Sequence, residues 1–162
     1  SILYAQVVLV QKGQAGAPGE LHGTFQTDRD LGELSANTTG GLFGTLTDAS
    51  LVQGLQPMPV AGRDEVHTGP AVIRSNIAGD TVEEYEVEIT HIYPESGDSN
   101  RDLMLTVTDP RLLEATGGIV QGMSGSPLIQ DGKLVGAVTH VLVNDPTQGY
   151  GILMEHMLDA AP

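Results

Sequence analysis

The sequence predicts an all-β protein of one and a half to two packed antiparallel barrels, and three observations support this fold class. The 162 residues include 21 glycines and 9 prolines, which supply the turns between many short strands. Aromatic residues make up only 4% and tryptophan is absent, so the core must rest on Val, Ile, Leu and Ala, which suits strands. Residues 81–93 also alternate apolar and acidic side chains with a period of two.

The first 60 residues are predicted to form a β-meander with small loops. The expected elements are, in order, a mostly apolar strand at 2–10, turns at 12–20, short strands at 21–26 and 32–34 around an exposed link at 27–30, a turn at 37–41, a strand at 42–46 and an extended connection at 54–60. The chain begins directly on a strand, so we expect one domain over residues 1–162 that is truncated before residue 1.

The second part of the chain is predicted to contain further strands and two short helical segments. The expected elements are strands at 71–76, 81–93 and 103–108, a polar loop at 94–100, a helical turn at 111–116, a hairpin of 128–130 with 133–139, strands at 141–143 and 151–153 around a loop at 144–149, and a helix at 155–160. The Asp131-Gly132 pair inside the hairpin is a strong turn signal. The glutamates of 81–93 are either a binding stripe or the solvated face of a half-buried strand.

Charge and composition exclude several classes of function. The net charge is −14, from 7 basic and 21 acidic residues, which argues against binding to nucleic acid or to anionic lipid. The acidity either serves solubility or attracts a basic substrate segment. Cysteine is absent, which excludes disulfides, zinc–thiolate sites and a cysteine nucleophile. No apolar run reaches 18 residues, so no membrane-spanning segment is expected, and no signal peptide is recognisable.

A single serine between two glycines is the main chemical motif of the chain. Ser124 lies in Gly122-Met123-Ser124-Gly125, immediately before the predicted hairpin. Flanking glycines allow a sharp turn that leaves the hydroxyl uncovered and directs backbone N–H groups to one point. A serine protease needs both an accessible Oγ and such donors for the oxyanion. The alternative is an ordinary Gly/Ser turn between two strands.

The sequence around this motif closely resembles the SpoIVB peptidase family of sporulating bacteria. The resemblance is most specific over residues 107–155, and it extends to Lys12-Gly13, Pro18–Leu21 and Gly41–Gly44. It implies a trypsin- or chymotrypsin-like antiparallel β-barrel with a short C-terminal helix, and a serine endopeptidase activity. Family members act during sporulation between the two forespore membranes, process themselves and cleave a partner protein that restrains an intramembrane protease. A secreted or membrane-associated location, a protein substrate and contact with its own N-terminal segment are therefore expected.

The same resemblance implies roles for individual residues. Ser124 is expected to be the nucleophile, with the N–H groups of Gly122 and Ser124 as the oxyanion hole. Asp109 matches the family's acidic triad member, which would orient a histidine. Its alternative role is to cap the helical turn that follows Pro110. Ser126 is expected to be structural.

The general base has no counterpart in the sequence. The family's catalytic histidine lies in a Gly-His-Gly element, and none of the five histidines here has glycine on both sides. His140 follows the nucleophile hairpin and is expected either to line the site or to be a hydrogen-bonded core or rim histidine. Either the histidine lies outside this chain, or the protein is a non-catalytic, protease-fold binding or scaffolding domain. The isolated 162 residues are expected to be nearly inactive.

Cofactor chemistry has little support in the sequence. The histidines are far apart and include no i,i+4 pair, and the acidic loops do not match an EF-hand. No phosphate-binding glycine loop of the usual spacing is present. We therefore expect no cofactor and no metal.

Overall fold

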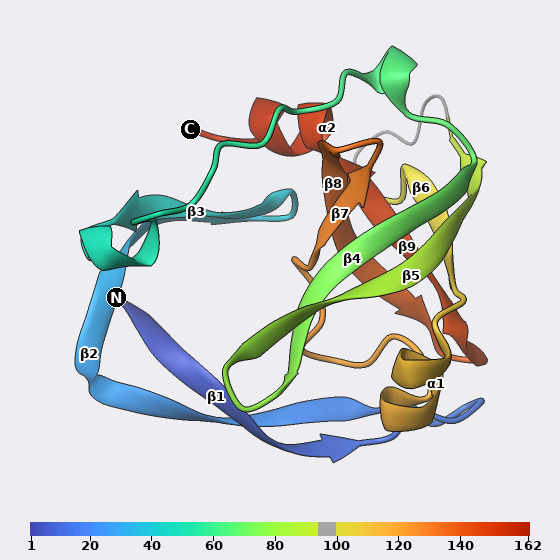
Figure 1. Cartoon of the computed structure of the whole chain (residues 1–162), viewed down its shortest axis with the longest axis horizontal. Coiled ribbons are helices and arrows are strands. Elements are labelled where there is room, and N and C mark those ends of the chain that lie inside the picture. Colours follow the sequence, from blue (N-terminus) through green and yellow to red (C-terminus); the bar gives the residue numbers. More distant parts are fainter. Residues whose placement is uncertain (94–99) are drawn as a thin grey trace.

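A computed structural model describes residues 1–93 and 100–162, so most of the expected loop at 94–100 lies outside the described residues. The strands form two sheets, one open and one closed (Figure 1). The all-β, chymotrypsin-like fold class predicted from the sequence is confirmed, with one complete barrel and a three-stranded sheet beside it. The short C-terminal helix is also present, as α2 (Met154–Asp159).

The closed barrel is built from the second part of the chain. Its strands follow one another around the barrel in the order β4-β5-β6-β9-β8-β7, every neighbouring pair is antiparallel, and β4 pairs with β7 to close the ring. The strands are β4 (Gly69–Ala78), β5 (Thr81–Ile92), β6 (Leu103–Val107), β7 (Pro127–Gln130), β8 (Lys133–Leu142) and β9 (Asp145–Leu153). Because the ring is complete, the barrel leaves no unpaired sheet edge.

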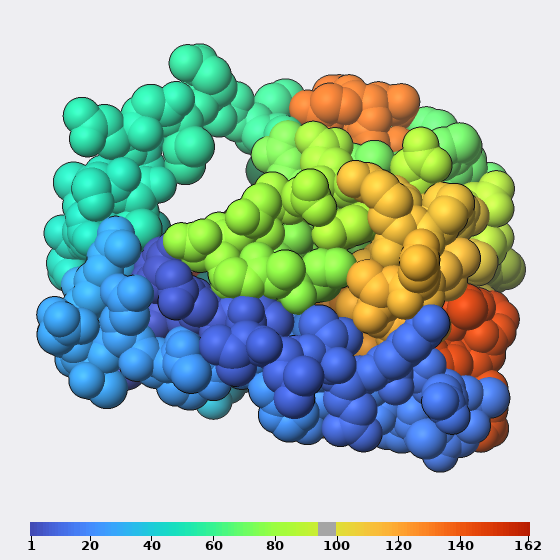
Figure 2. Space-filling model, turned by 60° about the horizontal axis from the view of Figure 1, so that its bottom comes forward, coloured from blue at the N-terminus to red at the C-terminus, as the bar shows by residue number. Residues whose placement is uncertain are grey.

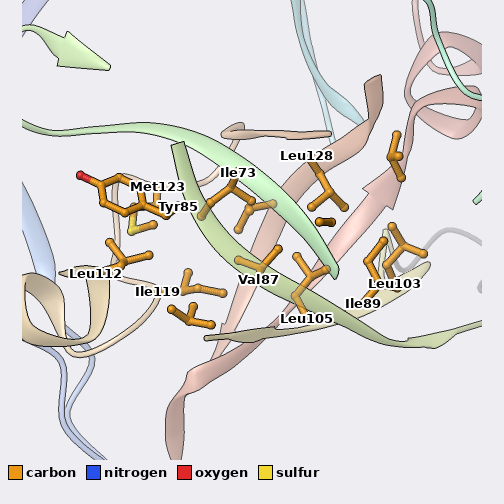
Figure 3. Packing of buried hydrophobic residues seen from close by; sticks show 14 of the residues in the cluster. Ile73, Tyr85, Val87, Ile89, Leu103, Leu105, Leu112, Ile119, Met123 and Leu128 are labelled. Carbon is orange, nitrogen blue, oxygen red and sulfur yellow. The ribbon is translucent and has the colours of Figure 1, made fainter. Parts of the chain in front are cut away.

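Strand β5 shows why these residues form a barrel. Tyr85, Val87 and Ile89 are buried, whereas the glutamates between them are exposed. The inward side chains meet those of the other strands and of α1 (Pro110–Thr116) in one core, shown in Figure 3. The predicted hairpin is confirmed as β7–β8, and both Asp131 (φ 53°) and Gly132 (φ 74°) have the positive φ that a type I′ turn requires.

The open sheet has the order β1-β2-β3 and consists of β1 (Ile2–Gln11), β2 (Glu20–Thr38) and β3 (Gly41–Leu46). The expected link at 27–30 was wrong, because β2 runs through it and Asp30 pairs with Leu3. Backbone pairing needs no apolar side chain, so the exposed polar residues gave no strand signal. Two 3-10 helices follow, at Ala49–Leu51 and Arg63–Glu65.

The expected loop at 144–149 was also wrong, because β9 begins at Asp145. Pro146 is tolerated there because the β8–β9 register shifts between Val141 and Leu142, beside the turn. The carbonyl of Pro146 instead accepts the N–H of Ile119 at 2.8 Å. This bond fixes the start of the loop that carries Ser124.

The open sheet is joined to the barrel at a few points. Val7 and Gly79 exchange both backbone hydrogen bonds at 2.8 Å, which attaches β1 to the β4–β5 hairpin. The N–H of Leu21 donates to the carbonyl of Gln121, and the N–H of Gln121 to that of Gly19. The first part of the segment after β3 stands away from the barrel, and Figure 2 shows an open space there. The segment then rejoins the barrel where Leu134 of β8 donates to the carbonyl of Pro59 and accepts the N–H of Ala61, both at 2.9 Å.

No helix in the described residues is long and apolar enough to cross a membrane.

Candidate active site

Ser124 lies in a tight loop between α1 and β7 whose backbone is held on both sides. Gly122 (φ 101°) and Gly125 (φ 89°) have left-handed conformations that other residues rarely adopt. Between them, the side chain of Met123 is completely buried in the barrel core. The N–H of Gly125 donates to the carbonyl of Val138 at 2.8 Å, which fastens the loop to β8. The loop therefore holds Ser124 at the surface on a rigid backbone.

The two backbone donors expected for an oxyanion hole carry no other hydrogen bond. Within residues 1–93 and 100–162, neither the N–H of Gly122 nor that of Ser124 has an intramolecular acceptor. The neighbouring N–H groups are used, because Met123 donates to Val120 and Ser126 donates to Met123. Unpaired backbone donors beside an exposed serine can stabilise an oxyanion.

The hydroxyl of Ser124 donates to the backbone carbonyl of Thr139 at 3.2 Å. An amide carbonyl does not accept the proton itself near neutral pH, so this bond orients the hydroxyl without activating it. In the described part of the chain no histidine is hydrogen-bonded to Ser124. Ser126, by contrast, is buried, donates its hydroxyl proton to Met123 O at 2.6 Å and accepts from the hydroxyl of Ser75 at 3.1 Å, as a structural residue would.

A cleft of about 690 Å³ opens beside Ser124, between the barrel and the turn that joins β2 to β3. Its described lining residues come from six parts of the chain: Asn37–Leu42, Asn100, Ser124 with Gly125, Ala137–His140, Ile152 and Met157. None of these side chains carries a formal carboxylate, lysine or arginine charge. The open sheet therefore supplies one wall of the site and the barrel supplies the other.

His140 lies in the wall of this cleft, half-buried on β8. Its Nδ1 is 2.9 Å from the hydroxyl of Thr139. Burial, with a smaller contribution from the positive charge of Arg101, lowers the pKa of His140 below its ordinary value. The imidazole is therefore neutral at pH 7, in the state that can accept a proton, but no hydrogen bond joins it to Ser124.

Asp109 is not among the residues that line the cleft, so the structure does not bring it together with Ser124. Its carboxylate is the N-cap of α1 and accepts the backbone N–H of Arg111 at 2.9 Å and that of Glu86 at 3.0 Å. The Arg111 guanidinium also binds both oxygens. Chiefly because of Arg111, the pKa of Asp109 falls to about 2. This geometry is the capping alternative, and the triad role of Asp109 stays a prediction.

Two other histidines form close pairs with carboxylates and make no hydrogen bond to Ser124. His156 Nδ1 is 2.8 Å from Oδ2 of the fully buried Asp102, and His67 Nε2 is 2.7 Å from Asp131 Oδ2 at the surface. In the described residues no three His, Asp or Glu side chains gather into a metal site. The His156–Asp102 pair was missed from the sequence, because 54 residues separate the partners and neither lies in a motif.

Comparisons with known proteins assign the chain to a family. The model of the SpoIVB peptidase S55 family matches residues 1–158. The chain belongs to the SpoIVB peptidase family. Its fold is similar to that of the Rv3671c protease from M. tuberculosis, in the crystal structure of the active form, with a TM-score of 0.58 and 16% sequence identity. No curated protein sequence matches.

The match to the Rv3671c protease covers 90% of this chain and 63% of that one. The chain thus spans less than two thirds of the protease it resembles. At this level of identity the likeness shows the fold, while membership of the SpoIVB peptidase family shows a serine peptidase domain.

Proposed function

We propose that this SpoIVB peptidase domain is a serine endopeptidase in which Ser124 attacks the peptide carbonyl. The observation that carries the proposal is the loop itself, where an exposed hydroxyl stands on a rigid turn with two unpaired backbone donors beside it. The N–H groups of Gly122 and Ser124 stabilise the oxyanion, and losing one such donor typically costs about 10²–10³ in rate.

The general base in this proposal is a histidine outside the 162 residues. Support comes from the hydroxyl of Ser124, which donates to a carbonyl and not to an imidazole. The family's Gly-His-Gly element has no match here, and the cleft beside Ser124 offers room for an incoming side chain. An N-terminal segment of the same protein is the partner we propose as its source. Among the described residues that line the cleft, His140 is the histidine, and it is the rival base.

The finer functions follow from the family resemblance. We propose that the domain processes its own chain and cleaves a partner protein that controls a sporulation signal, in the space between the forespore membranes. The competing function is a protease-fold binding domain without hydrolysis, which the absence of a matching base in these residues favours.

Cleavage of an unfolded protein substrate by the full product of the gene tests the proposal. Ser124→Ala is expected to lower kcat by about a millionfold, as loss of a nucleophile does in other serine proteases. Ser126→Ala is the matched control, because it removes a hydroxyl two residues away that faces Ser75, and it should leave most activity. Cleavage that Ser124→Ala leaves unchanged would contradict the role of Ser124, and no cleavage by either protein would favour the binding domain.

A further inference from the structure

A chain of three hydrogen bonds links the tip of the open sheet to the hydroxyl of Ser124. Ser124 Oγ donates to the carbonyl of Thr139 at 3.2 Å, and Thr139 Oγ1 donates to the carbonyl of Asn100 at 2.9 Å. The side-chain amide of Asn100 in turn donates to the carbonyl of Thr39, in the β2–β3 turn. All four residues line the same cleft.

Counting the available protons shows which group donates in each of these hydrogen bonds. The hydroxyl of Thr139 has one proton, and the carbonyl of Asn100 can only accept it. His140 Nδ1, 2.9 Å from the same hydroxyl, must therefore donate, which places a proton on Nδ1. In the neutral imidazole Nε2 then carries the lone pair. The chain keeps its hydrogen bonds whether His140 is neutral or protonated, because Nδ1 holds a proton in both forms.

Asn100 is anchored from the barrel side. Its φ of 56° is left-handed, a conformation that asparagine adopts more readily than most residues. Two residues further on, Asp102 is fully buried, and its N–H donates to Gly151 at 2.9 Å. The Asp102 carboxylate accepts hydrogen bonds from the N–H of Leu153 and from Nδ1 of His156, both at 2.8 Å. The segment that follows Asn100 is therefore fixed to β9 and α2 through Asp102.

At the far end of this series of hydrogen bonds, the turn of the open sheet lies close against α2 and the residue after it. A Cβ atom on Gly40 would lie 2.6 Å from Cβ of Ala160, and one on Gly41 would lie 3.0 Å from Cε of Met157. At Gly40 only glycine allows this close approach, whereas the methyl group of Met157 beside Gly41 is the end of a flexible side chain. Thr39, which accepts the Asn100 amide, is the residue immediately before this contact.

We propose that Asn100 and Thr139 are positioning residues that couple the docking of the β2–β3 turn to the orientation of the Ser124 hydroxyl. The inference rests on the proposed role of Ser124 as the nucleophile. When the turn sits on α2, Asn100 is held between Thr39 and Thr139, and the Thr139 carbonyl holds the hydroxyl of Ser124 toward the cleft. Release of the turn breaks the side-chain bond of Asn100 to Thr39, which loosens the Asn100 carbonyl that holds Thr139, and the Ser124 hydroxyl loses its single orientation.

Solution NMR of the 162-residue chain tests the coupling without any need for activity. The reporters are the Ser124 Cβ–Hβ resonances, assigned by their loss in Ser124→Ala, and the carbonyl ¹³C shift of Thr39. Asn100→Gly keeps the left-handed backbone but removes the amide, and it is expected to shift both reporters. Asn76→Ala removes an equivalent side-chain bond to a carbonyl, that of Gly79 in the β4–β5 hairpin, and should shift neither.

A second pair of variants keeps the test decisive if Asn100→Gly fails to fold. Thr139→Val removes the hydroxyl at nearly constant shape and should shift the Ser124 resonances, whereas Thr139→Ser restores the hydroxyl and should restore them. In an active full product of the gene, Thr139→Val should lower kcat roughly 10- to 100-fold with KM unchanged. Ser124 resonances that stay in place in both Asn100→Gly and Thr139→Val would overturn the coupling, while the proposed peptidase function would still stand.

Discussion

The closed barrel and the open sheet differ in how much apolar surface they bury. Among the described residues, the large side chains that are almost completely buried lie in the barrel strands, as Ile73, Leu105 and Leu128 do, or in α1 and the loop after it, which pack against them (Figure 3). In the strands of the open sheet the only buried hydrophobic side chain is that of Leu31. Several large apolar side chains of the sheet are exposed instead: Leu3, Val8, Leu9, Phe25, Leu34, Leu42 and Leu46.

This difference shows how the work of the site is divided. The barrel has its own core and supplies Ser124, the oxyanion donors and His140. The sheet has almost no core, yet it reaches the site twice, through Gly19–Leu21 against Gln121 and through the β2–β3 turn against α2. An element with few buried contacts opens more easily than a packed core. We therefore expect local opening of the sheet, more than opening of the barrel, to change the geometry of the site.

The largest expected contrast comes from shortening one leucine in each region. Leu105→Ala leaves a cavity in the barrel and should lower the free energy of unfolding by about 2–5 kcal/mol. Leu46→Ala, on an exposed side chain of β3, should change it by less than about 0.5 kcal/mol. Denaturant unfolding of both variants measures the difference. Similar losses in the two variants would mean that the sheet shares the core of the barrel.

The next prediction concerns Asp109, which lies at the start of α1 and binds the N–H of Glu86 in the barrel strand β5. The pKa of its carboxyl is about 2 in the folded protein against 3.8 for an unperturbed aspartate. This difference corresponds to up to about 2 kcal/mol of stability, because each pKa unit is worth about 1.4 kcal/mol. Since the folded pKa is the lower one, the contribution is present above about pH 4 and is lost as the pH falls toward 2.

Asp109→Asn should therefore be less stable than wild type at pH 7, and the gap should close on acidification. Unfolding midpoints measured between pH 2 and pH 7 show this directly. A variant that keeps wild-type stability at pH 7 but loses about 10⁴ in kcat would instead support the triad role of Asp109.

The smallest expected effect tests the attachment of the turn to α2. Gly40→Ala places a methyl group where Ala160 already lies, and overpacking of this kind costs about 1–3 kcal/mol in a tight core and less near a surface. Hydrogen exchange in β2 and β3 should become faster while that of β5 and β6 stays unchanged. Adding Ala160→Gly should restore slow exchange, and a double variant that exchanges as fast as Gly40→Ala would argue against this contact.

The sequence was informative wherever local chemistry determines the structure. The alternation of β5 and the Asp131-Gly132 turn predicted their elements, and the glycines around Ser124 predicted an exposed hydroxyl. It was less informative in β2 between Thr27 and Asp30, where polar residues continue the strand through a shift of the β1–β2 register. The cleft depends on Asn37–Leu42 and Asn100, which reach Ser124 only through the fold, so no local pattern identifies them.

Covalent labelling with a fluorophosphonate, mapped by mass spectrometry, tests the central claim most directly. We expect the full product of the gene to be labelled on Ser124 and the 162-residue chain to remain almost unlabelled, because the chain supplies the nucleophile and the oxyanion donors without the base. Labelling of the 162-residue chain on Ser124 that disappears in His140→Ala would contradict the claim, since the base would then be His140.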